Sequence, residues 1–197
     1  MPSSILDILS QQLGGDVVNQ MSAQFGTDAG TMNNAIAAAL PMLLNGLARN
    51  SANPRGADAL SAALSRDHDG GILDDLVGFL GSGNTDTGAN ILGHIFGGKA
   101  DSMAAVLGRA SGMDASSAAS LLAMLAPLVM GTLGRMQRQE GLDAGGLSGM
   151  LGSERSRLEQ STPGLSGLTR MLDFDGDGQI MDDVGQIAGM LGQLFRR

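Results

Sequence analysis

The densest group of side chains able to do chemistry lies near the C-terminus, in residues 173–183, whose sequence is DFDGDGQIMDD. Calcium takes about six to eight oxygen ligands, and carboxylates at loop positions 1, 3 and 5 converge when a glycine at position 6 allows a sharp turn. These positions hold Asp173, Asp175, Asp177 and Gly178, and position 7 offers the backbone carbonyl of Gln179. The sequence therefore predicts a calcium site in an EF-hand-like loop.

The end of this loop departs from a complete EF-hand, which has a bidentate Glu at position 12. Val184 occupies that position, so Asp182 or Asp183 would have to close a shorter loop. The alternative is an acidic turn in which these two residues only favour the start of the next helix. We favour calcium, because neighbouring carboxylates without a cation repel one another. The candidate metal ligands are Asp173, Asp175, Asp177, Gln179, Asp182 and Asp183.

A weaker copy of the same pattern occurs in residues 67–75, DHDGGILDD, which align with residues 175–183 at a shift of 108. Ser65 stands at position 1 of this copy, so one carboxylate ligand is missing. The sequence predicts a helix-capping turn here, with metal binding as the alternative.

Residues 93–99, GHIFGGK, have the spacing of a phosphate-binding P-loop. A P-loop follows a buried strand and continues with Ser or Thr, whereas Ala100 follows here and the preceding residues are typical of a short helix. We therefore expect a helix stop and no nucleotide site. The two His residues, His68 and His94, have no partner at catalytic or metal-ligand spacing. No catalytic residue is predicted, and His94, between apolar neighbours, is expected to be partly buried.

The elements that position these groups are expected to be helices. The apolar residues are mainly helix-favouring Ala, Leu, Ile and Met, while Trp and Tyr are absent and Phe occurs five times. The 31 Gly residues predict short helices separated by breaks. The predicted fold is all-α and multihelical, with two related helical repeat units followed by the calcium-type loop and a helix.

The two repeat units become visible when the sequence is shifted by 86 residues, which aligns Pro41 with Pro127 and Asp28 with Asp114. These ordered matches predict a duplicated helical domain in residues 1–140, with units at about 1–50 and 87–136. The long helix of each unit should begin near its aligned Asp and be kinked or split by its proline. Residues 141–165 are expected to form a Gly-rich and polar linker that is mobile in its Gly-rich part, residues 141–152, and residues 166–197 the acidic loop and a terminal helix.

Composition excludes several classes of protein. A net charge of −8 with a single Lys leaves no basic surface for nucleic acid, and the absence of Cys excludes disulfides and thiolate metal sites. No stretch reaches the ~18 apolar residues that a transmembrane helix needs, and no basic start followed by an apolar run marks a signal peptide. We therefore expect a cytoplasmic protein without a transmembrane segment. The sequence indicates neither its partner nor its oligomeric state.

Residues 91–97, ILGHIFG, with HDGGILDD upstream, resemble the bacterial YidB-like family, domain of unknown function 937. The resemblance covers roughly the first 140 residues and implies a multihelical fold, but no activity, substrate or catalytic residue. We expect a non-enzymatic interaction or structural module that binds calcium and engages an unknown protein partner. Two alternatives are an enzyme with an unrecognised site in the helical body and a weak membrane-surface protein. The latter would use Phe195, Arg196 and Arg197 beside the apolar face of the terminal helix.

Overall fold

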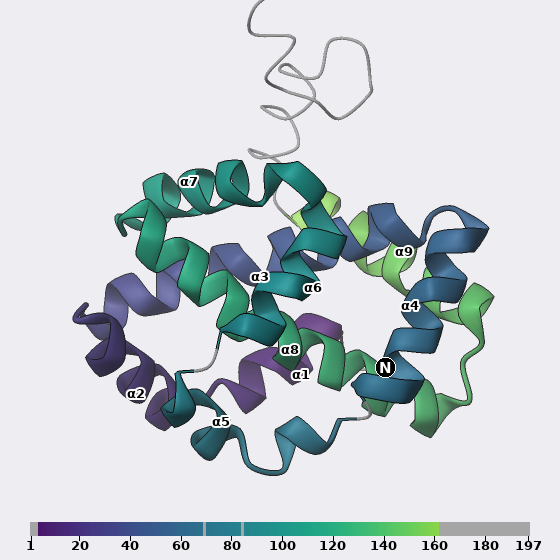
Figure 1. The fold of residues 1–197 in the computed structure, drawn as a ribbon, viewed down its shortest axis with the longest axis horizontal. Coiled ribbons are helices and arrows are strands. Elements are labelled where there is room, and N and C mark those ends of the chain that lie inside the picture. Colours follow the sequence, from purple (N-terminus) through teal and green to yellow (C-terminus); the bar gives the residue numbers. More distant parts are fainter. Residues whose placement is uncertain (1–3, 69, 84, 162–197) are drawn as a thin grey trace, which may run out of the picture. The chain divides into compact units, whose positions relative to one another are not determined.

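The computed structural model describes residues 4–161 except 69 and 84, and every regular element in this part of the chain is a helix (Figure 1). This confirms the predicted all-α, multihelical fold. The chain divides into two units, Met1–Arg155 and Ser156–Arg197, and of the second unit the structure describes only residues 156–161. The helices are α1 (Ile5–Gln12), α2 (Gly15–Phe25), α3 (Ala29–Ser51), α4 (Pro54–Asp67), the 3-10 helix η1 (Gly71–Leu73), α5 (Leu76–Ser82), α6 (Asp86–Phe96), the 3-10 helix η2 (Gly97–Lys99), α7 (Ala100–Ser111), α8 (Ala115–Glu140) and α9 (Ala144–Ser161).

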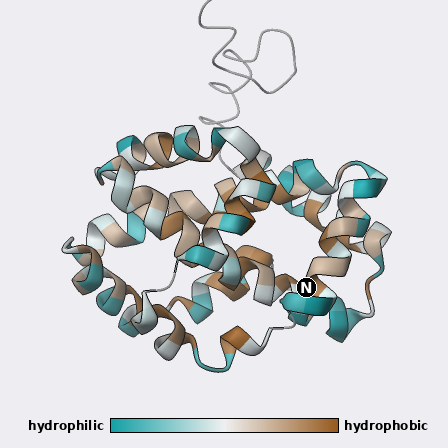
Figure 2. Cartoon of the chain, in the orientation of Figure 1, coloured by the Kyte–Doolittle hydropathy of each residue, from teal (hydrophilic) through white to brown (hydrophobic). Residues whose placement is uncertain are grey.

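The longest of these helices, α8, forms the centre of the first unit. Every residue from 121 to 134 is buried, and α8 contacts α1, α3, α4, α6, α7 and η1. This stretch is almost wholly Ala, Leu, Met, Val and Gly, so it can be enclosed on all sides. Its one hydroxyl, on Thr132, donates a 2.9 Å hydrogen bond to the Leu128 carbonyl. The surrounding helices carry both hydrophobic and hydrophilic residues, as Figure 2 shows, because each buries only one side.

Among the described residues, α8 is the helix that is long and apolar enough to cross a membrane by length and composition. However, 83% of its apolar window is buried inside the protein. Packing at the centre of the fold accounts for the same composition. No clear transmembrane segment therefore emerges from the part of the chain that the structure describes.

Each predicted repeat unit contains two shorter α-helices followed by a long one. These are α1, α2 and α3 in the first repeat unit and α6, α7 and α8 in the second. Asp28 and Asp114 are the N-cap residues of α3 and α8, and each accepts a 2.9 Å hydrogen bond from the backbone N–H three residues later. Such a cap satisfies one of the N–H groups that a helix start leaves without an internal partner. The aligned residues thus begin both long helices, while the duplication itself stays a prediction.

Neither Pro41 nor Pro127 divides its helix, so the expectation of a split is wrong. A proline has no N–H and leaves the carbonyl four residues earlier without its usual donor, which for Pro127 is the carbonyl of Ala123. Gly88 of α6 packs directly against this carbonyl, so closely that a Cβ at position 88 would overlap it. Packing of α6 on α8 therefore covers the point where the helical hydrogen bond is missing.

The largest difference from the sequence prediction lies at residues 141–165, where we expected a mobile linker. Residues 144–161 instead form α9. The Gly146 N–H donates a 2.7 Å hydrogen bond to the carboxylate of Asp143, the residue just before this helix. Leu147 and Leu151 are 0% and 1% exposed. Glycine disfavours a helix by only about 1 kcal/mol each, whereas each buried leucine contributes about 1.5–3 kcal/mol. Burial of one face therefore outweighs the Gly-rich composition.

Candidate functional site

The six predicted metal ligands, Asp173, Asp175, Asp177, Gln179, Asp182 and Asp183, lie outside the described residues. The structure therefore gives no position for the calcium-type loop. Its earlier copy, residues 67–75, is described except for Asp69 and shows how this sequence pattern folds. Within the described ranges, no group of three or more His, Asp and Glu side chains is placed to hold a metal ion.

The first residues of this copy belong to α4, which runs to Asp67. Ser65 and Asp67, at loop positions 1 and 3, are therefore helical, and the Ser65 hydroxyl donates a 2.9 Å hydrogen bond to the Ser61 carbonyl. Residues two apart on a helix do not face each other. These two side chains consequently cannot converge on a cation as they would in an EF-hand loop.

The chain turns at Gly70, which occupies position 6 of the copy. Its φ is +93°, a value that a residue with a Cβ adopts only at a cost. The carbonyl of Gly70 accepts a 2.9 Å hydrogen bond from Nη2 of Arg135 in α8. The turn is thus located where the loop pattern requires glycine, and Arg135 connects it to the central helix.

The two carboxylates at the end of the copy have separate partners. Asp74 forms an ion pair with Arg135, with 2.6 Å between Oδ1 and Nη2. Asp75 accepts a 3.0 Å hydrogen bond from the Gly78 N–H and caps the start of α5. This confirms the predicted helix-capping turn. Because the Asp74 side chain is 76% exposed, its ion pair contributes at most about 1 kcal/mol to stability.

Two glycines of α8 leave room for this segment to lie directly on the helix. A Cβ at Gly131 would meet the side chain of Ile72, and a Cβ at Gly134 would meet the carbonyl of His68. Glycine permits such a close approach because it has no side chain. We call residues 68–75, which cross α8 at this point, the crossing segment.

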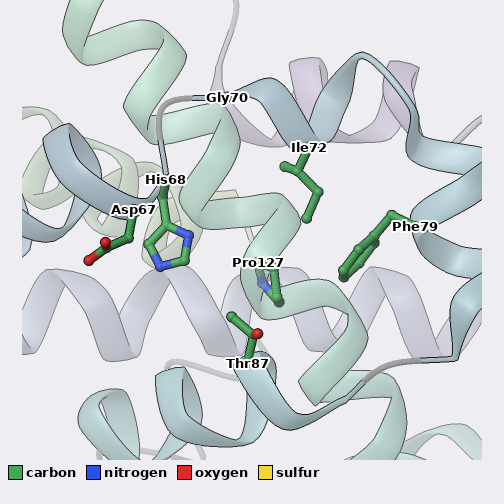
Figure 3. A pocket seen from close by; sticks show the side chains of 7 residues that line it. All are labelled: Asp67, His68, Gly70, Ile72, Phe79, Thr87 and Pro127. Carbon is green, nitrogen blue, oxygen red and sulfur yellow. The ribbon is translucent and has the colours of Figure 1, made fainter.

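A pocket opens between the crossing segment and the helices around it (Figure 3). Its cavity volume is about 160 Å³. Five different parts of the first unit line it: the end of α4, the crossing segment, α5, α6 and α8. The lining residues are Asp67, His68, Gly70, Ile72, Phe79, Thr87 and Pro127.

The imidazole of His68 faces this pocket, next to Thr87 and Pro127 (Figure 3). Burial lowers the pKa of His68 below its usual value of 6.5, and the negative charge of Asp67 acts in the opposite direction. The ring is therefore mostly uncharged at neutral pH, with one nitrogen able to donate a hydrogen bond and the other able to accept one. Within the described residues, the ring makes no hydrogen bond.

Two other residues considered in the sequence analysis, His94 and Lys99, do not line this pocket. His94 and Lys99 are exposed, so the expectation that His94 is partly buried is wrong. His94 is the third-last residue of α6, and its backbone carbonyl accepts a 2.6 Å hydrogen bond from Asn50. Helix α6 contains the first of the P-loop-like residues and ends at Phe96 with Gly97 as its C-cap, in agreement with the predicted helix stop.

Sequence reasoning missed Arg135, Phe79 and Thr87 as neighbours of the acidic copy. Arg135 lies 61 residues from Asp74 in the chain, and nothing in local spacing joins them. The only available signal was the alignment of Arg49 with Arg135 at the shift of 86. That match indicates a duplication and not an ion pair.

Comparison with known proteins places the chain in a family. The family model described as bacterial protein of unknown function (DUF937) matches residues 7–136. The chain belongs to this family. The match begins in α1 and ends within α8, so the family region includes the crossing segment and the pocket, whereas α9 and the C-terminal acidic loop follow it. No curated protein and no solved structure matches the chain significantly.

Proposed function

We propose that this protein is a non-enzymatic helical interaction or structural module that binds calcium through its C-terminal acidic loop. The family description names no activity that would favour another class. The calcium ligands in this proposal are the side chains of Asp173, Asp175, Asp177 and either Asp182 or Asp183, with the backbone carbonyl of Gln179.

The observation that carries the proposal is the turn at Gly70, which aligns with Gly178 of the acidic loop. In the described copy, the chain turns at this glycine and begins α5 immediately after Asp75. The aligned residues of the acidic loop end at Asp183. Similar sequences favour similar local structure, so the copy supports a sharp turn at Gly178 and a helix that begins just after Asp183.

Differences between the two copies favour a cation at the C-terminal one. Position 1 is Asp173 in the acidic loop and the helical Ser65 in the earlier copy. Arg135 neutralises one carboxylate of the earlier copy, whereas residues 171–195 contain no Lys or Arg. Five Asp residues within 173–183 would repel one another, and a divalent cation removes that repulsion.

The interaction role rests on the helix expected after the acidic loop. Val184, Ile187, Leu191 and Leu194 follow at spacings of three and four, which place them on one helical face. In this proposal calcium orders the loop and the helix together, and the apolar face then binds a protein partner. Calcium would thus control when the face is available.

Isothermal titration calorimetry of the full chain tests the calcium proposal directly. We expect saturable binding with a dissociation constant on the order of 10⁻⁴–10⁻³ M, because the bidentate Glu of a complete EF-hand is missing. Magnesium, which demands stricter octahedral geometry, should bind more weakly. The double substitution Asp175→Ala and Asp177→Ala should abolish the heat of calcium binding.

Asp67→Ala is the matched control, since Asp67 aligns with Asp175 but lies at the end of α4. This variant should bind calcium as the unmodified protein does. An absence of binding heat at millimolar calcium would reduce residues 173–183 to an acidic turn and refute the proposal. Equal loss of binding in Asp67→Ala would refute the assignment of the ligands.

A further inference from the structure

We propose that the pocket between the crossing segment, α5, α6 and α8 binds a small uncharged molecule with one ring and one hydroxyl group, of the size of phenol. The described residues that line this pocket, from Asp67 to Pro127, belong to the first unit. The inference therefore does not depend on the calcium proposal, and either one can fail without the other.

The volume of the cavity sets the size of the ligand. At about 160 Å³ it is smaller than the roughly 300 Å³ at which sites for drug-sized molecules begin. An apolar cavity of about 150 Å³ in a protein core accepts a benzene ring. The pocket therefore has room for one six-membered ring with a short substituent.

Three residues on two sides of the pocket offer carbon surface for such a ring. Ile72 and Phe79 face Pro127 across the cavity (Figure 3). Ile72 lies against Gly131 of α8, and the preceding turn is attached to Arg135. Pro127 is buried in the central helix. These contacts hold the apolar wall in place before a ligand arrives, which lowers the entropic cost of binding.

The pocket also supplies two polar groups, the imidazole of His68 and the hydroxyl of Thr87 (Figure 3). Neither group has a hydrogen-bond partner within the described residues. An uncharged imidazole and a hydroxyl can each donate and accept. A ligand hydroxyl does the same, so it can pair with either group.

The charge of the lining disfavours ionised ligands. Among the described residues that line the pocket there is no Lys or Arg, and the one formal charge is on Asp67, whose carboxylate points away from Ile72 and Phe79 (Figure 3). A charged group placed among uncharged partners would lose hydration without gaining an ion pair. The neutral hydroxyl compound is therefore preferred over a carboxylate of the same shape.

NMR titration of the full chain with phenol tests this inference, because the protein contains only two His residues. The ring signal of His68 should shift and saturate, with a dissociation constant on the order of 1 mM for seven non-hydrogen atoms. The signal of the exposed His94 should not move, and His94→Gln assigns the two signals. Benzoate is the matched anion and should leave His68 unchanged.

Thr87→Val removes the hydroxyl with little change of shape and should weaken phenol binding about two- to tenfold, the usual effect of one hydrogen bond. Far-UV circular dichroism checks that this variant folds. The inference is overturned if the His68 signal does not saturate, or if both His signals move alike. Equal affinity for benzoate, or unchanged affinity in Thr87→Val, would overturn the assigned ligand chemistry.

Discussion

Replacement of Leu147 by Ala tests whether residues 144–155 of α9 pack as a helix in the first unit. Leu147 is completely buried, and Leu151 lies one turn further along the same face. Two polar contacts attach the helix near these residues. Ser148 donates a 2.7 Å hydrogen bond to the Ser51 carbonyl, and the Leu6 N–H approaches Glu154 Oε1 at 3.5 Å. The substitution removes apolar contacts without touching either bond.

The expected loss follows from burial. A completely buried Leu→Ala change costs about 2–5 kcal/mol, through lost transfer energy and the cavity that remains. In a protein of this size, each kcal/mol lowers the melting temperature by about 2–4 °C. Leu147→Ala should therefore lower it by roughly 4–20 °C. If residues 141–165 were a mobile linker, Leu147 would be exposed and the change would stay within about 0.5 kcal/mol.

The assay is thermal and urea unfolding, each followed by far-UV circular dichroism, since the protein contains no Trp or Tyr for fluorescence. Gly149→Ala is the matched control, because Gly149 lies in α9 and the position that an added Cβ would take is open space. In a helix this change should stabilise the protein by about 0.5–1 kcal/mol. Neutral results for both variants would refute the packed helix and restore the predicted linker.

Three other perturbations test the packing and the charges of the first unit. Gly88→Ala should destabilise the protein by about 1–3 kcal/mol, because its Cβ would overlap a backbone carbonyl of α8. Gly93→Ala, on an open face of the same helix, should stabilise it. Thermal unfolding of both variants measures the two effects. Arg135→Met should cost about 1–2 kcal/mol in urea unfolding, and the part due to the exposed ion pair should disappear in 1 M salt. A side-chain hydrogen bond from Thr31 holds the pKa of Asp28 below its usual value, so this carboxylate stabilises the fold above about pH 4 and loses that effect as the pH falls further. Unfolding midpoints of Asp28→Asn and the unmodified protein should therefore differ at pH 7 and converge as the pH falls through the lowered pKa of Asp28, and a constant difference would contradict the assignment.

Local sequence determined where the long helices begin and that the fold is all-α. Asp28 and Asp114 cap their helices through hydrogen bonds that reach only three residues along the chain. Asp75 caps α5 in the same way, and Gly70 turns the chain at the position the loop pattern assigns to glycine. These features could be predicted because their energies depend on neighbouring residues alone.

The elements that differ from the prediction are those whose energy comes from distant residues. Glycine-rich residues 144–155 become helical because Leu147 and Leu151 are buried against the first unit, and Pro127 stays inside a continuous helix that α6 covers. The pocket likewise exists only because the crossing segment lies on Gly131 and Gly134 of α8. Hydrophobic burial depends on which surfaces meet, and that is decided by the tertiary fold and not by local spacing.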